Sequence, residues 1–426
     1  MIYDICIIGA GASGMAAAIC AGRMGARTAV LERMARPGKK ILVTGNGKCN
    51  LSNTALSAGA EPDYEAYYRG NIPAFAAEVL TRFDTEKIIQ FMESAGIYTH
   101  QKDGYLYPMS DQALSVRNAL ERAMEETGCV RVYTECCVCR IESPKPESKD
   151  SVFMIHSENR LCIRARNLII AAGGCAAPKQ GSDGSGYRLA SMLGHSLILP
   201  LPALTALHCK EKYMKDLAGI RCRAHVRLYA DHKILAQDTG ELQLTNYGIS
   251  GIPVFQVSRF ASRALHDGRS VTAQIDFFPE IPQGSLQKMI ADSATAHPDF
   301  NMITVLSGLM NEKMASVMTK QILPGQLKTP ASRWSQKDLS RLTDILKDHT
   351  LQITATNGFD QAQVCCGGVD TSQIDPDTLQ SKITSGLYII GELLDIDGIC
   401  GGFNLHWAFA TGCIAGTHAA KRRQHA

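Results

Sequence analysis

A strand, a glycine-rich turn, a helix, a second strand and an acidic residue follow one another at the start of this chain. Residues 5–8 are Ile-Cys-Ile-Ile, a short apolar run typical of a buried parallel strand. Residues 9–14 read Gly-Ala-Gly-Ala-Ser-Gly, a GxGxxG, and residues 15–21 are rich in good helix formers. A second apolar run, residues 28–31, ends at Glu32. This order predicts a βαβ unit that opens a parallel α/β sheet.

The glycines of this motif have distinct mechanical roles. Gly9 permits the tight turn, Gly11 lets backbone approach a pyrophosphate, and Gly14 lets helix and strand pack closely. The N-terminus of the helix that follows offers free N–H groups and the positive end of its dipole to phosphates, and Ala12 and Ser13 are counted among the expected cofactor contacts. A glycine-rich turn without a ligand is the alternative. The complete order of strand, helix, strand and acid favours a dinucleotide site.

The acid at the end of the second strand limits which dinucleotides can bind. Glu32 lies about twenty residues beyond the glycines, where a carboxylate bonds ribose hydroxyls. The same carboxylate would repel a 2′-phosphate, so the site suits FAD or NAD and not NADP. Arg33, next in the chain, is counted with Glu32 among the expected cofactor contacts.

The far end of the chain decides between FAD and NAD. Residues 387–390 form an apolar strand that Gly391 and Glu392 close. Gly401 and Gly402 then lead into a helix, and these two glycines, Phe403 and Asn404 complete the expected contacts. Proteins with two-dinucleotide flavin folds end in this way: the acid bonds the ribityl chain, and the helix N-terminus faces the flavin N1–C2=O edge. We therefore expect FAD.

A third segment is consistent with this expectation. Residues 167–174 form a buried strand ending in small residues, and in FAD folds such a strand crosses beneath the cofactor, which makes Ala172 and Gly173 contacts. A generic core strand is the alternative. Residues 181–186 are glycine-rich but have the wrong spacing for a second GxGxxG. NADH or NADPH, if it is the electron donor, is thus expected to dock transiently.

Three motifs together resemble one bacterial family, the HI0933-like flavoproteins, described broadly as NAD(P)/FAD-dependent oxidoreductases. They are the N-terminal fingerprint, the segment Thr44–Asn53 (TGNGKCNLSN) and the run from Gly391 to Asn404. The resemblance spans nearly the whole chain and includes Gly367-Gly368-Val369 and residues 245–251. It implies an FAD fold. Some gut members are linked to reduction of 3-oxo bile-acid enones, and others carry an aminoacetone oxidase label.

The chain departs from this family pattern at a few positions. Lys48 stands where Arg is common, and Cys365-Cys366 stand where Thr and a small residue are usual. Neither change touches the expected phosphate site. The second change puts a threonine role near the flavin in doubt.

A loop after the second strand supplies further expected cofactor contacts. Lys48 could contact the pyrophosphate or attract a substrate anion, whereas a loop capped by its Asn side chains is the alternative. Lys39 and Lys40 are expected to be exposed, with Lys40 retained as a contact. Val138 is expected where FAD folds bond adenine through backbone. The contacts assigned here are Lys40, Gly47, Lys48, Cys49, Asn50 and Val138.

The chain changes character near residue 199. Short alternating runs with turn signals, such as residues 238–240, predict antiparallel β structure, a barrel or sandwich, and residues 283–347 are mostly helical in pattern. The expected fold class is α/β: a discontinuous Rossmann-like FAD-binding domain with an inserted antiparallel β-barrel or sandwich and a helical subdomain. The expected domains are residues 1–198 and 350–426 for the FAD-binding domain and 199–349 for the insertion.

Two local patterns of the first domain complete the expected fold. Residues 75–96 predict one amphipathic helix, and residues 142–150 predict a hairpin loop. Gly412 and Gly416 form a GxxxG, which in a helix of this kind means close packing against a sheet.

Composition excludes several classes of protein. The net charge is only +3 over 426 residues and aromatic residues make up 6%, which argues against a nucleic-acid partner. No apolar stretch is long enough to span a bilayer. Fifteen scattered cysteines without a secretory signal favour the cytoplasm. The expected partner is a small-molecule substrate, and the oligomeric state is open.

Few catalytic side chains are expected, because a flavin carries the redox chemistry. Cys400 and His406 lie near the expected flavin edge and are candidate acids, with a loop thiol and a structural histidine as the alternatives. Residues 136–139 contain a CxxC, but buried core cysteines explain it better than a disulfide. No second CxxC supports zinc, so no metal is expected. Tyr105 and Tyr107 could line a substrate pocket or simply pack.

Four functions remain open at this stage. The first is reduction of a carbon–carbon double bond conjugated to a ketone, with hydride passing from NAD(P)H through flavin N5. The second is an oxygen-dependent amine oxidase that releases peroxide. The others are a flavin-dependent tRNA modifier and a flavin-binding protein without catalysis.

Overall fold

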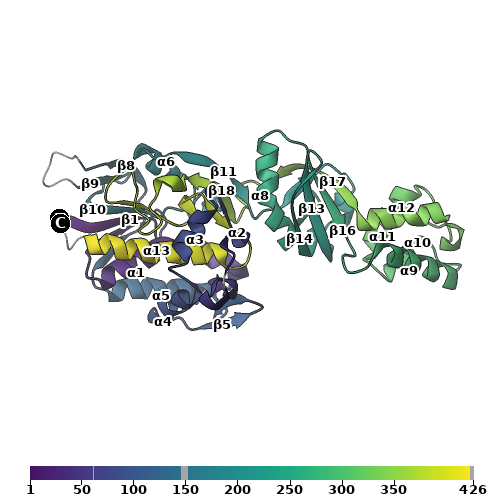
Figure 1. The fold of residues 1–426 in the computed structure, drawn as a ribbon, viewed down its shortest axis with the longest axis horizontal. Coiled ribbons are helices and arrows are strands. Elements are labelled where there is room, and N and C mark those ends of the chain that lie inside the picture. The colour runs from purple at the N-terminus through teal and green to yellow at the C-terminus, as the bar shows by residue number, and fades with distance from the viewer. Residues whose placement is uncertain (61, 145–151, 423–426) are drawn as a thin grey trace. The chain divides into compact units, whose positions relative to one another are not determined.

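The computed structural model describes residues 1–60, 62–144 and 152–422 and divides into two compact units (Figure 1). Unit 1 comprises Met1–Leu201 and Phe359–Ala426, and unit 2 is Pro202–Gly358. The second boundary differs from the expected residue 349, because the strand that starts there pairs within unit 2 rather than with the dinucleotide sheet. The loop predicted over residues 142–150 lies mostly outside the described residues.

Unit 1 is built on a seven-stranded sheet of order β7-β2-β1-β10-β9-β8, with β19 also paired to β10. Strands β7, β2, β1, β10 and β19 run parallel, and β9 and β8 are antiparallel. The strands are β1 (Ile2–Ile8), β2 (Thr28–Leu31), β7 (Val130–Tyr133), β8 (Val138–Glu142), β9 (Phe153–Ser157), β10 (Cys162–Ile170) and β19 (Leu387–Ile389).

The parallel strands end at one edge of this sheet, because their register is aligned. Ile8 pairs with both Leu31 and Ile170, and Ile170 pairs with Ile389. The segments that follow these four strands therefore lie next to one another, and they are the four segments that carry the sequence motifs. Ligands of open α/β sheets bind outside this carboxyl edge.

Helix α1 (Ala12–Arg23) packs against both α5 (Ala113–Glu126) and α13 (Phe403–Arg422), and all three contact strands of the sheet (Figure 1). The GxxxG of α13 meets helix α1 and not a sheet, contrary to the prediction. A Cβ on Gly412 would overlap the Ser13 carbonyl oxygen, and one on Gly416 would overlap that of Ala17. These glycines let the two helix backbones touch, which sequence alone could not reveal because either partner demands small residues.

The helix predicted over residues 75–96 is two helices, α3 (Ala74–Leu80) and α4 (Thr85–Ser94). The Asp84 side chain accepts a hydrogen bond from the Lys87 backbone N–H at 3.0 Å and so starts a new helix. The prediction was wrong here because an apolar period continues across the break.

Smaller elements complete unit 1. Three short strands form one sheet, β4 pairs with β20, and β11 pairs with β18. The elements are β3 (Ser52–Asn53), α2 (Tyr64–Tyr67), β4 (Tyr68–Gly70), β5 (Thr99–Lys102), β6 (Tyr105–Pro108), α6 (Ser185–Met192), β11 (Leu197–Ala203), β18 (Val364–Val369) and β20 (Ile396–Gly398).

Unit 2 contains a closed antiparallel barrel of order β12-β15-β14-β13-β16-β17, with its own apolar core. Residues 238–240, predicted as a turn, lie inside the continuous strand β14 and pair with residues 224–226 of β13. The strands are β12 (Leu207–Cys209), β13 (Arg221–Ala230), β14 (Lys233–Leu244), β15 (Gly248–Gly251), β16 (Val271–Asp276) and β17 (His349–Thr356).

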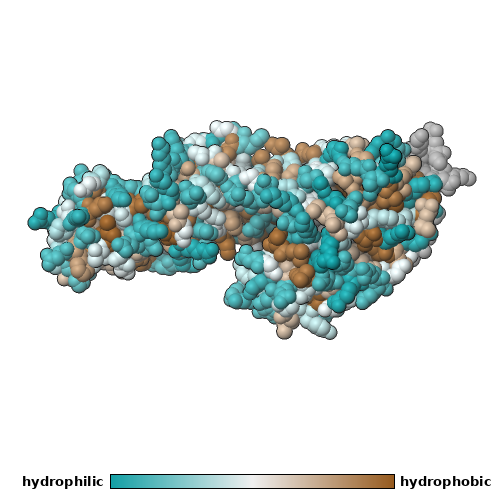
Figure 2. Space-filling view, turned by 180° about the vertical axis from the view of Figure 1, so that it is seen from behind, coloured by the Kyte–Doolittle hydropathy of each residue, from teal (hydrophilic) through white to brown (hydrophobic). Residues whose placement is uncertain are grey.

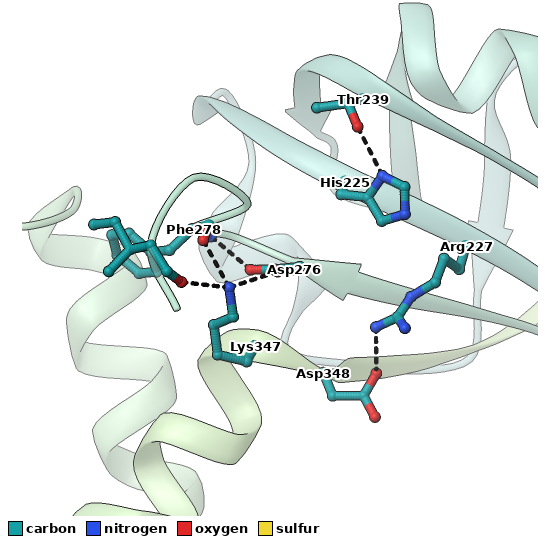
Figure 3. Close-up of polar contacts among 8 residues, drawn as sticks. His225, Arg227, Thr239, Asp276, Phe278, Lys347 and Asp348 are labelled. Atoms are coloured by element: carbon teal, nitrogen blue, oxygen red, sulfur yellow. Dashed lines mark hydrogen bonds and ion pairs between the residues drawn. The ribbon is translucent and has the colours of Figure 1, made fainter. Parts of the chain in front are cut away.

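A largely buried lysine ties the end of helix α12 (Gln336–Lys347) to barrel strand β16 (Figure 3). Lys347, at the end of α12, pairs with Asp276 at 2.7 Å, and its ammonium also donates to the carbonyls of Phe278 and Ile281, each at 2.7 Å. All three N–H groups of the ammonium are thereby used. The helices of unit 2 are α7 (Met214–Leu217), α8 (Ile252–His266), α9 (Gln283–Ala296), α10 (Met302–Ser307), α11 (Glu312–Ile322) and α12 (Gln336–Lys347).

The surface in Figure 2 is mostly hydrophilic, with apolar residues in small groups. Within the described residues, no helix combines the length and apolar character that crossing a membrane requires. The fifteen cysteines are free thiols.

Candidate functional site

The three glycines of the N-terminal motif differ in what surrounds them. A Cβ on Gly9 would lie 2.5 Å from the Ala171 carbonyl oxygen, and one on Gly14 would overlap the Gly9 carbonyl oxygen. A Cβ on Gly11 would meet nothing within 4 Å. Gly9 and Gly14 are therefore required by internal packing, whereas Gly11 borders open space at the start of α1. No side chain caps that helix start.

Glu32 holds the glycine loop in place. Its carboxylate accepts the backbone N–H of Ala10 and that of Met34, each at 2.8 Å, and the residue is only 7% exposed. Burial raises the pKa of Glu32, although these two N–H groups oppose the shift. Two carboxylate oxygens offer about four lone-pair sites, so the carboxylate retains capacity for hydroxyl donors.

The residues around Glu32 link three segments at this part of the sheet edge. The Arg33 guanidinium forms an ion pair with Asp183, which the sequence did not single out. The Glu32 carbonyl accepts the Cys136 N–H at 2.8 Å, so the segment leading to β8 runs alongside β2. Val138 begins β8 two residues later and is buried. The structure thus places Val138 and Arg33 in segments next to Glu32.

The acid of the C-terminal motif is paired with a lysine 352 residues away in sequence. The Lys40 ammonium donates to Glu392 Oε2 at 2.6 Å, and both side chains are largely buried. The other oxygen, Oε1, accepts the Cys365 backbone N–H at 3.1 Å. The expected exposure of Lys40 was wrong, because a charge partner so distant in sequence is invisible before folding. Lys39 is exposed as expected.

The N-terminal and C-terminal motifs touch each other at Gly391. A Cβ there would lie 2.7 Å from the Ser13 hydroxyl oxygen. The Gly391 N–H donates to the Thr411 hydroxyl at 3.1 Å, and its carbonyl accepts the Trp407 indole N–H at 3.0 Å. Helix α13 therefore fixes the Gly391 turn against the start of α1. Ala172 lies beside this contact, since its Cα is 3.0 Å from where a Gly9 Cβ would stand.

The loop of residues 44–53 reaches the turn that precedes α13. Asn53 donates from Nδ2 to the Gly401 carbonyl at 3.0 Å, and a Cβ on Gly402 would lie 2.7 Å from Asn50 Oδ1. Asn50 Oδ1 is buried and has no hydrogen-bond partner. Buried polar atoms are rarely left unpaired, so this orphaned acceptor fits a ligand donor at this turn.

Other residues of the same loop have different environments. Lys48 pairs with Asp111 at 3.3 Å, and both side chains are about half exposed. Cys49 is fully buried, and burial raises the pKa of its thiol to about 12. Gly47 borders open space. Of these three, Cys49 is the one whose side chain lies in the core, which leaves only its backbone for a ligand.

Phe403 and Asn404 stabilise the turn itself. The Asn404 side chain forms two hydrogen bonds with the Gly398 backbone, one from its N–H and one to its carbonyl, each at 2.8 Å. The Phe403 ring stacks on Tyr67 with 4.8 Å between centroids, and its carbonyl accepts the Tyr68 hydroxyl at 3.0 Å. Their side chains are committed to the fold, and the N–H groups of this helix start remain for a ligand.

Both ring nitrogens of His406 are engaged within the fold. It is fully buried; Nε2 faces the Phe83 carbonyl at 2.8 Å, and Nδ1 faces the Ser52 hydroxyl at 2.7 Å. The carbonyl can only accept, so Nε2 carries the proton and Nδ1 accepts from Ser52. Burial lowers the pKa of His406 to about 4. Cys400 is partly exposed in the turn beside Gly401.

The CxxC spans the start of strand β8. Cys136 and Cys137 precede β8, and Cys139 lies in it. Cys136 is buried, and burial raises the pKa of its thiol and that of Cys137.

Sequence reasoning missed the polar groups that converge on Gly174. A Cβ there would lie 3.0 Å from Cys365 Sγ, 3.0 Å from the Tyr187 hydroxyl and 3.1 Å from Glu392 Oε1. The paired glycines at the end of β10 were the signal, since Gly173 was treated as a contact and Gly174 was not. The partners of Gly174 come from distant segments, and no local pattern identifies them.

The sheet edge, the open glycine and the paired acids define a Rossmann-type flavoprotein oxidoreductase. The family model for the HI0933-like protein Rossmann domain matches residues 3–418, and the chain belongs to this family. The chain is 41% identical over 418 residues to the 3-dehydro-bile acid delta(4,6)-reductase of Clostridium scindens, covering 98% of each sequence.

Two further proteins resemble the chain less closely. It is 27% identical to the ribosomal RNA dihydrouridine synthase of Escherichia coli, covering 98% of this chain and 99% of that one. The structure of 3-ketosteroid delta1-dehydrogenase from Sterolibacterium denitrificans superposes with a TM-score of 0.52 at 12% identity, covering 99% of this chain and all of the other. That likeness concerns the fold.

Proposed function

We propose that this chain uses FAD to reduce a carbon–carbon double bond conjugated to a ketone in a steroid-like or bile-acid-like substrate, with NADH or NADPH as the electron donor. The observation that carries the proposal is the identity with the Clostridium scindens reductase across almost the whole chain. The sheet-edge geometry supports the cofactor part independently. A cytoplasmic location, favoured by the scattered free thiols, belongs to the same proposal.

The residues present fit a dinucleotide. The open space at Gly11 and the uncapped start of α1 suit a pyrophosphate, for which Ala12 and Ser13 supply backbone N–H groups. Glu32 keeps acceptor capacity for ribose hydroxyls, and Glu392 with Lys40 forms a charged pair on the C-terminal side.

The start of α13 suits the flavin end. The orphaned Asn50 Oδ1 and the backbone of Gly401, Gly402 and Phe403 surround one turn. Bound FAD would supply hydride transfer through its N5 atom. The chain's own contribution is electrostatic, because the N-terminal end of a long helix stabilises negative charge that lies close to it.

The cofactor and its donor are tested by one anaerobic absorbance titration of the purified full chain. We expect flavin absorbance that bleaches with NADH or NADPH. Bleaching by neither nicotinamide contradicts the donor assignment. Peroxide release on adding small amines in air, without bleaching by nicotinamides, would replace the proposal with the amine-oxidase alternative.

The substrate is tested with a matched pair of acceptors. A 3-oxo bile acid carrying conjugated double bonds should reoxidise the bleached flavin and yield a product heavier by two hydrogens per bond reduced. The corresponding saturated 3-oxo bile acid is the control and should do neither. Reoxidation by both or by neither compound contradicts an enone reductase, while the bleaching result still stands for the cofactor.

A second candidate substrate is a uracil base in RNA. The relatives named as dihydrouridine synthases align over almost the whole chain, and the uracil C5=C6 bond is also conjugated to a carbonyl. Unit 2 carries 18 Lys and Arg residues against 14 Asp and Glu, so the positive charge of the chain lies in this unit. Dihydrouridine formation in ribosomal RNA incubated with the reduced protein, and no turnover of the enone, would favour this candidate.

A further inference from the structure

Two cysteines from distant segments meet beside the Lys40–Glu392 pair. Cys175 follows the glycines at the end of β10, and Cys365 lies in β18. The Cys175 backbone N–H donates to Cys365 Sγ at 3.1 Å. The two side chains are close enough for Cys365 to lower the pKa of the Cys175 thiol. Both residues pack in the same small apolar cluster with Ala176, Ala362 and Phe359.

The polar surroundings of this pair are unusual for core cysteines. Cys365 Sγ, the Tyr187 hydroxyl and Glu392 Oε1 all lie about the point where a Gly174 Cβ would stand, and the Cys365 N–H donates to Glu392. Lys40 neutralises the carboxylate from its other side at 2.6 Å. Polar groups therefore surround the Cys365 sulfur on one side, and a side chain at position 174 would fill the space between them.

The two thiols differ in accessibility. Cys175 is partly exposed, whereas Cys365 is buried. The Cys175 Sγ lies over Gly184, within 2.7 Å of where a Cβ would stand, so a glycine makes room for this sulfur too. The neighbouring Cys365 side chain lowers the pKa of the Cys175 thiol, and Lys40 acts in the same direction, whereas burial, Glu392 and Asp183 oppose the shift. A partly exposed thiol with a lowered pKa reacts first with an oxidant.

We infer that Cys175 and Cys365 form a peroxide-sensitive thiol pair that closes to a disulfide. The Cys175 thiolate attacks one oxygen of hydrogen peroxide, the O–O bond breaks, and the released hydroxide takes up a proton to give water and a Cys175 sulfenic acid. The Cys365 thiol then attacks the Cys175 sulfur, the S–S bond forms, and the S–O bond breaks with loss of a second water. Two thiols are oxidised by two electrons, and one peroxide is reduced to two waters.

The disulfide would link the loop after β10 to β18 at the Glu392 side chain. The covalent S–S bond would then hold the two segments together where now the Cys175 N–H donates to a thiol sulfur, and it would fix the position of Cys365 Sγ beside Gly174. This site does not depend on which substrate or electron donor the protein uses, because the oxidant is peroxide and the groups belong to the chain itself.

The test uses the full-length protein, reduced, freed of reductant and exposed to a small molar excess of hydrogen peroxide before quenching with N-ethylmaleimide. After alkylation in denaturant, we expect two N-ethylmaleimide adducts fewer than in the reduced control and a cross-linked peptide pair containing Cys175 and Cys365. Both differences should vanish when dithiothreitol is added before the alkylation. Cys365→Ser should instead accumulate a dimedone adduct at Cys175, because the second thiol is missing. Cys162→Ser removes an exposed cysteine elsewhere and should leave the cross-link unchanged.

A second thiol pair in the same unit supplies the internal standard. Cys20 of α1 and Cys413 of α13 are also neighbours, since Cys413 lowers the pKa of the Cys20 thiol, but they lie on two helices packed backbone to backbone. We expect this pair to stay reduced in peroxide and therefore to be alkylated by N-ethylmaleimide. Recovery of Cys175 and Cys365 as alkylated thiols overturns the inference. Cross-linking of Cys20 to Cys413 to the same extent also overturns it, because the site would then have no selectivity.

Discussion

The two units use buried charge in different ways. In unit 1, Glu32 and Glu392 stand after parallel strands, hold backbone N–H groups or a lysine, and lie around an edge where Gly11 borders open space. In unit 2, Lys347 and Asp276 satisfy each other and two carbonyls. The comparison teaches that burial of charge by itself does not indicate a ligand site; what sets unit 1 apart is a glycine that borders open space at the same sheet edge.

The glycines of unit 1 make the same distinction on a smaller scale. Gly14 and Gly11 are three residues apart, yet a Cβ on one overlaps backbone and a Cβ on the other meets nothing within 4 Å. An alanine at each of these two positions therefore distinguishes a glycine that packing requires from a glycine that a ligand requires. These two substitutions give the largest contrast expected in this protein.

Gly14→Ala should prevent a stable unit 1, because its Cβ overlaps the Gly9 carbonyl and neither backbone segment can yield. Gly11→Ala should fold normally and lose flavin occupancy, because the added methyl group projects into the space proposed for the pyrophosphate. Circular dichroism and flavin absorbance of the two purified variants check this pair. Full flavin occupancy in Gly11→Ala contradicts the assignment.

Lys347→Met should destabilise unit 2 by about 3 kcal/mol, since removal of one partner leaves a largely buried carboxylate uncompensated. Hydrogen exchange measured by mass spectrometry should increase at residues 276–281 and 336–347 and stay unchanged at residues 2–32. The double variant Lys347→Met/Asp276→Leu is the control and should recover part of the loss. Exchange that increases equally in both units would show that the two are energetically coupled.

Each unit also contains a buried neutral histidine, His406 in unit 1 and His349 in unit 2. Burial lowers the pKa of each to about 4 from 6.5, and His349 Nε2 lies 3.0 Å from the Tyr213 hydroxyl. Below pH 6.5 the unfolded chain binds a proton that the folded chain refuses, so stability falls as the pH drops from 6.5 toward 4.

The loss amounts to about 1.4 kcal/mol per pH unit for each histidine within that window. Urea unfolding at pH 7.5 and pH 5.5 measures it. His406→Gln keeps a donor for the Phe83 carbonyl and should reduce the pH dependence in unit 1 alone, whereas His349→Gln should do so in unit 2. An unchanged pH dependence in either variant would show that the corresponding histidine titrates normally in the folded state.

The smallest effect is expected at Arg227, whose guanidinium pairs with Asp348 at 3.3 Å (Figure 3). Asp348→Asn should change the free energy of unfolding by less than about 1 kcal/mol, because the carboxylate is half exposed and solvent screens it. Urea unfolding at low and high salt checks this. A larger, salt-independent loss would mean that this pair stabilises the barrel as Lys347 does.

The predictable part of the site consists of residues that act through local backbone. The GxGxxG at residues 9–14 follows the first strand, and Glu32 follows the second. The apolar pattern of each strand predicts where that strand ends, and so predicts the positions of these residues. Gly391 and Glu392 share this property. The exposure of Lys40 was misjudged, because its partner Glu392 lies near the other end of the chain. The burial of His406 is likewise invisible in the sequence.

The fold shows the same division. The order of strands and helices follows from apolar period, so the α/β class and an antiparallel insertion could be predicted. Two features could not be predicted. The helix breaks at Asp84 because this side chain caps a new helix although the apolar period continues. Strand β14 continues through residues 238–240 because pairing with β13 outweighs their turn preference.

The sequence by itself determined that a dinucleotide-type unit opens and closes this chain, since short-range motifs encode turns, strand ends and helix starts. Only the tertiary structure decided which polar groups share an environment. Cys175 with Cys365, Lys40 with Glu392 and Asn50 with Gly402 are each joined across long stretches of chain. The physical reason is that burial and electrostatic pairing depend on distance in space, and distance in space between remote segments is set by packing the whole core.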